Sequence, residues 1–150
     1  MRYGPLVVLA CLMMALIVPA AAADEERYSY IRVKEVSINV VNDKAVVEVG
    51  YSLDEGIRLL ILLLGKGDLK NKLLKIVNYE EATIQDVNLE RAVIVVDNAS
   101  TDYGDGCYWF PEHTFSVTVP SLEVRTPQTV RRFNMTKSIP VGIGHFRVEQ

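Results

Sequence analysis

Residues 30–53, YIRVKEVSINVVNDKAVVEVGYSL, determine the fold class, because apolar and polar side chains alternate along both halves of this stretch. Alternation with a period of two is typical of β-strands that bury one face. The alternation shifts by one residue at Lys34-Glu35, which predicts a β-bulge. Asn42-Asp43 is a turn pair that suits chain reversal. We therefore predict a β-hairpin, and half of each strand should face a core.

Two helices are expected directly after the hairpin. Ser52 and Glu55 have the spacing of a capping box at a helix start, and a leucine-rich run follows from Ile57 to Leu64. Gly65 suits the left-handed conformation in which many helices end. Gly67-Asp68 then opens a second helix, in which apolar and lysine side chains lie on opposite faces. The pair is predicted to form a helical hairpin that covers the sheet.

The run from Ile57 to Leu64 contains Arg58 as its only polar residue. We predict that this helix is buried against the sheet, because a helix that is apolar all round is normally buried. Its eight residues are too few to span a bilayer. A re-entrant segment and the wall of a lipid-sized cavity are the alternative interpretations.

From Ala82 onward the chain returns to strand-like patterns, in short runs that are separated by turn residues. The predicted strands lie around Thr83 to Val87, Ala92 to Val96, Cys107 to Phe110 and Phe115 to Val119. The sequence thus predicts an α+β fold: an N-terminal β-hairpin, a two-helix insertion and an antiparallel, β-rich C-terminal half that share one core.

The N-terminus has the three-part form of an export signal. Arg2 supplies a basic start, and the residues from Leu6 to Val18 form an apolar run. The small residues Ala21 to Ala23 then precede an acidic stretch that begins at Asp24. The protein should therefore be exported, either to the extracellular cell envelope or as a secreted protein.

We expect cleavage after Ala23, which divides the chain into a signal peptide, residues 1–23, and a single domain, residues 24–150. After cleavage no stable membrane span should remain. An uncleaved anchor is the alternative, because Leu6 to Ala23 is 18 residues long, close to the minimum for a span. A lipoprotein signal with Cys11 as the acylated residue fits less well, because the apolar run continues past that cysteine.

Composition narrows the classes of partner. Because Arg2 is the only charged residue before Asp24, residues 24–150 carry 15 Lys and Arg against 19 Asp and Glu, a net charge of −4. A negative net charge argues against nucleic acid as the partner.

Cys107 is the only cysteine of residues 24–150, so it has no internal disulfide partner and is expected to be a small buried hydrophobe. The sequence contains no cofactor-binding motif and assigns no oligomeric state.

The most distinctive stretch is DNASTDYGDGCYWFPEHTF, residues 97–115, which contains the only Trp and four acidic residues. Adjacent strand positions face opposite sides, so at least one of Tyr108, Trp109 and Phe110 should lie on the outer face. Tyr103, Tyr108 and Trp109 are therefore the candidate binding residues, for a protein or a glycan at the cell surface.

The acidic residues of the same stretch suggest two other functions. Asp97, Asp102 and Asp105 are the candidate ligands of an irregular calcium site, although no EF-type register fits and a simple turn is favoured. Glu112 and His113 are neighbours, which an extended strand directs to opposite faces. No catalytic residue is assigned. A metal-assisted or acid/base hydrolase built on Asp102, Asp105, Glu112 and His113 is the alternative to a binding function.

Two Asn-x-Ser/Thr sequons, at Asn98 and Asn134, become glycosylation candidates if the chain is exported, and Asn98 lies in the more polar loop. The export signal together with IRVKEVSINV, GIRLLILLLGKGDL and DYGDGCYWFPEHTF resembles small exported proteins of unknown function from methane-producing archaea. The resemblance covers most of residues 24–150 and implies an outer-surface location that is open to glycosylation. It carries no catalytic motif. We therefore expect an exported interaction module rather than an enzyme.

Overall fold

The computed structural model describes Tyr28 and residues 30–148, and in it the predicted hairpin is formed by β1 (Ile31–Val41) and β2 (Lys44–Leu53). The two strands pair antiparallel, and their register shifts between Val33 and Glu35, which confirms the predicted bulge. Asn42 occupies the turn with a positive φ of 55°, a conformation that Asn tolerates better than most residues. The predicted signal peptide and its cleavage site lie outside the described residues.

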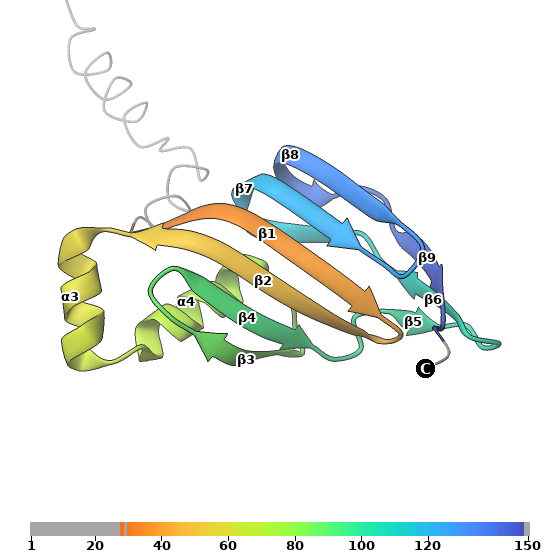
Figure 1. The fold of residues 1–150 in the computed structure, drawn as a ribbon, viewed down its shortest axis with the longest axis horizontal. Coiled ribbons are helices and arrows are strands. Elements are labelled where there is room, and N and C mark those ends of the chain that lie inside the picture. The colour runs from red at the N-terminus through yellow and green to blue at the C-terminus, as the bar shows by residue number, and fades with distance from the viewer. Residues whose placement is uncertain (1–27, 29, 149–150) are drawn as a thin grey trace, which may run out of the picture.

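The hairpin is the middle of a six-stranded sheet with the order β3-β4-β2-β1-β7-β8 (Figure 1). β1 pairs in parallel with β7, and every other strand pair in the described part of this sheet is antiparallel. The additional strands are β3 (Ala82–Val87), β4 (Arg91–Val96), β7 (His113–Arg125) and β8 (Val130–Ile139). The structure is thus of the predicted mixed class, with sheets that are mostly antiparallel.

A second, smaller sheet contains β5 (Thr101–Asp102), β6 (Cys107–Phe110) and β9 (Ile143–Phe146) in the order β5-β6-β9. It lies at one end of the long axis of the molecule, and the first helix lies at the other end (Figure 1). Buried side chains of this sheet, such as Phe110 and Ile143, belong to the same hydrophobic cluster as Ile38 of β1. One core therefore joins the two sheets.

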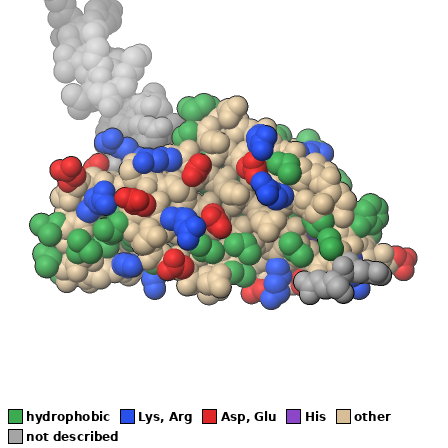
Figure 2. Space-filling model, in the orientation of Figure 1, with side chains coloured by type: hydrophobic (Ala, Val, Ile, Leu, Met, Phe, Trp, Pro, Cys, Tyr) green, Lys and Arg blue, Asp and Glu red, His purple; other side chains and the backbone are tan. Residues whose placement is uncertain are grey.

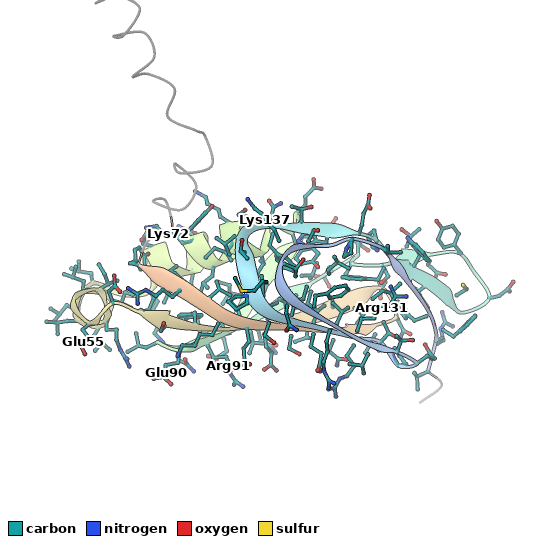
Figure 3. The ribbon with its side chains drawn as sticks, turned by 90° about the horizontal axis from the view of Figure 1, so that it is seen from above. Glu55, Lys72, Glu90, Arg91, Arg131 and Lys137 are labelled. Carbon is teal, nitrogen blue, oxygen red and sulfur yellow. The ribbon has the colours of Figure 1, made fainter. Side chains whose placement is uncertain are left out.

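The second helix, α4 (Gly67–Val77), packs on the six-stranded sheet as predicted. It contacts β7 and β3, and its buried residues are Leu69, Leu73, Ile76 and Val77. Seen from above, α4 with Lys72 lies on one side of the sheet, and Glu90 and Arg91 lie on the other (Figure 3). The helix thus covers one face of the sheet, and none of the described helices covers the other.

The first helix, α3 (Glu55–Leu64), begins and ends close to the predicted residues but is not capped as predicted. Its N-cap residue is Asp54, without a side-chain capping bond, and Ser52 stays within β2, so the predicted capping box is wrong. Gly65 ends the helix with φ at 93°, where glycine is favoured, and its amide N–H donates to the carbonyl oxygen of Ile61.

The predicted burial of α3 against the sheet is also wrong. Within α3, which is described in full, only Ile61 is buried. Leu59, Leu60, Leu62, Leu63 and Leu64 are 59%, 49%, 66%, 72% and 82% exposed. The helix follows the last residues of β2 at the end of the sheet, and it projects beyond the face that α4 covers (Figure 1). In the described part of the chain, no helix has both the length and the apolar character needed to cross a bilayer.

Candidate functional site

The outer face of the three-stranded sheet carries exposed aromatic side chains. In β6 the side chains of Tyr108 and Phe110 are buried, whereas Trp109 between them is 41% exposed. Trp109 lies opposite Gly144 of β9, and Cys107 lies opposite Phe146, which is 62% exposed. The predicted outward-facing ring of this strand is therefore Trp109. We call Tyr103, Trp109 and Phe146 the aromatic face.

Trp109 rests on a strip of glycine backbone. A Cβ atom at Gly142 would lie 2.5 Å from Cε2 and Cζ2 of the indole ring, a distance that real side chains do not reach. A Cβ atom at Gly144 would lie at an ordinary contact distance of 3.6 Å from Cε3. The sequence Gly142-Ile-Gly144 thus lets the ring approach the backbone of β9, which holds one side of the indole and leaves the remainder accessible.

Tyr103 supplies the most exposed ring of the aromatic face, at 71%. It lies in the turn between β5 and β6, where its amide N–H donates to the carbonyl oxygen of Cys107 at 2.9 Å. Gly104, Asp105 and Gly106 all have positive φ values, which form the tight reversal after it. The acidic and glycine residues of this stretch therefore build a turn.

Tyr108, the third candidate binding residue, faces the interior and is only 4% exposed. Its ring stacks on His145, with the ring centroids 5.5 Å apart, and its hydroxyl accepts a hydrogen bond of 2.9 Å from Arg147. The ring of His145 is also buried, and its Nε2 lies 3.0 Å from the carbonyl oxygen of Asn42 in the β1–β2 turn. Tyr108 and His145 thus attach the small sheet to the hairpin and do not reach the surface.

The three candidate calcium ligands do not share a site. Asp97 forms an ion pair with Lys44 at 3.0 Å, and the Oδ1 atom of Asp102 accepts a hydrogen bond of 2.8 Å from the amide of Gly104. Asp102 and Asp105 border a shallow cavity of about 400 Å³ together with Arg147. Across residues 30–148 no three His, Cys, Asp or Glu side chains gather closely enough to hold a metal ion.

His113 lies at the start of β7 and faces the end of α4. Its ring stacks on Tyr79, with the centroids 3.7 Å apart, and its Nε2 lies 2.6 Å from the carbonyl oxygen of Val77. Burial lowers the pKa of His113 below its ordinary value of 6.5, and the hydrogen bond to Val77 opposes the shift only in part. Glu112 is exposed next to it. His113 is therefore occupied in a structural contact and is not paired with an acid.

The remaining candidates have distinct surroundings. Cys107 is partly exposed, not buried as predicted, because it shares the outer side of β6 with Trp109. The side-chain amide of Asn98 donates to Glu81 at 2.6 Å, and the hydroxyl-bearing residue of that sequon, Ser100, is 6% exposed. Asn134 is exposed on β8, an edge strand of the large sheet.

A second exposed surface is formed by the leucines of α3, which the sequence predicted to be buried. Figure 2 shows hydrophobic side chains gathered at the end of the molecule that α3 occupies. Burying a leucine fully is worth about 1.5–3 kcal/mol, so five leucines left largely in water are a substantial cost for an isolated domain. Contiguous exposed apolar groups of this kind normally mark a contact surface. The run LLILLL, residues 59–64, was the signal that could have indicated this exposure, because it has no polar residue on any side and only an external partner can cover such a short helix on several sides.

Comparison with protein-family models, with curated proteins and with solved structures found no match to this chain.

Proposed function

We propose that the chain is an exported cell-envelope or secreted interaction module, and that its aromatic face binds a protein at the cell surface. The observation that supports the proposal is the placement of Trp109: its ring rests on Gly142 while 41% of the residue stays exposed. An aromatic ring held in this way contributes a large contact area with little loss of side-chain entropy on binding. Tyr103 and Phe146 extend the surface with rings that are more exposed still.

A protein partner is favoured over a glycan by the polar groups around the aromatic face. A sugar needs side-chain donors and acceptors placed beside the stacking ring. Here the Oδ1 atom of Asp102 accepts from Gly104, and the guanidinium group of Arg147 donates to Tyr108. The side chain of Gln128 is paired with both backbone polar groups of Phe146. Asp102, Arg147 and Gln128 each have a partner within the molecule, which suits a mainly apolar protein contact.

The alternative, a hydrolase built on Asp102, Asp105, Glu112 and His113, finds no support in the geometry of the described residues. Asp102 and His113 make the internal contacts described above, and His113 faces α4 whereas Asp102 lies in the small sheet. A general acid and base must both lie within hydrogen-bond reach of one substrate. We therefore make no catalytic proposal.

The proposal can be tested with the chain that begins at Asp24, which retains every described residue of the core cluster. The immobilised domain is incubated with the solubilised envelope fraction of the producing cells. A partner should be retained by the unaltered domain and lost with Trp109→Ala and with Tyr103→Ala, whose ring is exposed and leaves no cavity. Met135→Ala is the matched control, because Met135 and Tyr103 are both 71% exposed.

Treatment of the envelope fraction separates the two classes of partner. Protease digestion should abolish retention, whereas periodate oxidation of sugars should not. Loss of retention with periodate alone would replace the protein partner by a glycan. Equal retention by the unaltered domain and both aromatic variants would contradict the role of the aromatic face.

A further inference from the structure

The exposed leucines of α3 extend around too much of the helix circumference to be covered by one flat protein surface. Successive residues of an α-helix are about 100° apart, so Leu59, Leu60, Leu62, Leu63 and Leu64 together occupy an arc of about 200°. A helix that packs on one sheet or one other helix needs an apolar stripe of roughly 100°. Ile61 points to the domain and is buried, and the remaining circumference projects outward. A convex apolar ridge of this form suits a fluid apolar medium.

The length of α3 is consistent with a position in the surface of a bilayer. Ten residues give a helix of about 15 Å, half of the hydrocarbon thickness of a membrane. Such a helix cannot cross, but its side chains can enter the boundary between headgroups and acyl chains, which interfacial helices reach to a depth of about 5–10 Å. The last charged residue of α3 is Arg58, so the six residues that follow it in the helix offer only apolar side chains.

The chain that follows α3 has the charge that an anionic membrane surface attracts. Residues 65–77 contain four lysines, Lys66, Lys70, Lys72 and Lys75, against one acid, Asp68. Lys66 and Lys70 lie in the first turns after Leu64 and are both exposed, but the ammonium group of Lys66 donates to the carbonyl oxygen of Val87 at 2.7 Å. Basic residues that flank an apolar insertion bind the phosphates of acidic lipids. Apolar and basic groups are thus combined at the C-terminal end of α3, whereas the exposed acids Asp54 and Glu55 lie at its start.

The same end of the domain is the one where the chain arrives from its apolar N-terminal run. Ile31, the first residue of β1, pairs with Leu53, and α3 begins two residues later at Glu55. The apolar run ends at Val18, only ten residues before Tyr28. Even a fully extended chain of that length spans no more than about 35 Å, so Tyr28 lies within this distance of Val18. While that run is held in a membrane, α3 therefore cannot move far from the membrane surface.

We propose that the leucines of α3 insert into the surface of a lipid bilayer that contains anionic lipids, and that this contact docks the domain peripherally. The aromatic face lies at the opposite end of the long axis (Figure 1), so a docked domain presents it away from the bilayer. The contact does not depend on the aromatic face, and it holds whether residues 1–23 are cleaved or retained. A second copy of the chain and a groove on another protein are the competing ways to cover α3.

Flotation with lipid vesicles tests the proposal on the chain that begins at Asp24. The domain should float with vesicles of phosphatidylcholine and phosphatidylglycerol in roughly a 7:3 ratio, and less with phosphatidylcholine alone or at high salt. Leu63→Ser/Leu64→Ser should lower the bound fraction about ten-fold or more. Val130→Ser/Met135→Ser, which removes two exposed apolar side chains from β8, should bind like the unaltered domain. Lys70→Gln should lower binding only to the anionic vesicles.

A fluorescence measurement tests the orientation independently. Trp109 is the only tryptophan and belongs to β6, which lies at the opposite end of the long axis from α3 (Figure 1), so brominated phospholipids should leave its emission unchanged when the domain is bound. Introducing Leu63→Trp should add an emission component that these lipids quench. Absence of vesicle binding, equal binding by Leu63→Ser/Leu64→Ser, or an unquenched signal from the introduced tryptophan would each overturn the proposal. So would self-association that the double serine variant abolishes without any vesicle binding, because a second copy would then cover α3.

Discussion

Gly142 lies so close to the indole ring of Trp109 that a Cβ atom at this position would meet two ring atoms at 2.5 Å. Gly142 itself is buried. The ring can therefore make room for a side chain at this position only by moving outward, which breaks its contact with the backbone. The aromatic face therefore depends on a residue that has no side chain. This dependence can be measured without knowing the partner.

Gly142→Ala should destabilise the domain by about 1–3 kcal/mol, because the added methyl group forces the ring or the strand to move. Gly144→Ala is the matched control and should change the free energy of unfolding by no more than about 0.5 kcal/mol, since its Cβ would meet the same ring at 3.6 Å. In a Trp109→Ala background the effect of Gly142→Ala should largely vanish. Urea unfolding of the unaltered domain and the four variants provides the measurement, and equal costs at both glycines would contradict the contact.

Removing a leucine should lower the stability of the domain when the leucine lies in α4 and leave it almost unchanged when it lies in α3. Leu73→Ala in α4 should cost about 2–5 kcal/mol, because Leu73 is fully buried in the core. Leu63→Ser in α3 should change stability by about 0.5 kcal/mol or less, since Leu63 is 72% exposed. Denaturant unfolding of the domain without lipid distinguishes the two. A loss at Leu63 as large as that at Leu73 would mean that α3 is packed in solution.

His113 should make the domain less stable in weak acid. Burial lowers its pKa in the folded state, so below the ordinary value of 6.5 the unfolded chain takes up the proton first. The free energy of unfolding should therefore be unaffected by this residue above that pH and should fall as the pH drops through the folded-state pKa. His113→Gln, which keeps a donor for Val77 but cannot titrate in this range, should lose less stability between neutral pH and about pH 5.5. Equal losses in the two proteins would exclude His113 as the cause.

Native material should begin at Asp24 or within a few residues of it, because the small residues up to Ala23 precede an abrupt acidic start. Mass spectrometry of the intact protein from cells and medium provides the measurement. A chain that still begins at Met1 and stays in the membrane fraction would contradict cleavage.

Short-range patterns were sufficient to predict several elements of the fold. The slip of alternation at Lys34 predicted the bulge, because each residue added to a strand turns the following side chains to the other face. The apolar face of α4 predicted its burial, because leucine and lysine alternate there with a helical period. The parallel pairing of β1 with β7 joins Glu35 to Ser121, and no local pattern specifies a contact over that separation.

The candidate site was predicted in part, for related reasons. Alternation in β6 required one outward-facing ring but did not identify Trp109, because its contact partner Gly142 lies just before β9, far along the chain. The environment of α3 was predicted wrongly because apolar composition shows that a helix must be covered, without showing whether its own domain or something outside it provides the cover.

The most direct test of the proposed function is photo-crosslinking in intact producing cells, with a photoreactive phenylalanine at position 103 or, as the control, at position 135. The two native residues, Tyr103 and Met135, are equally exposed at 71%, but only Tyr103 belongs to the aromatic face. Irradiation should give a discrete protease-sensitive adduct from position 103 that is absent from position 135 and is lost when Trp109→Ala is added. No adduct from position 103, or the same adduct from both positions, would contradict a binding role for the aromatic face.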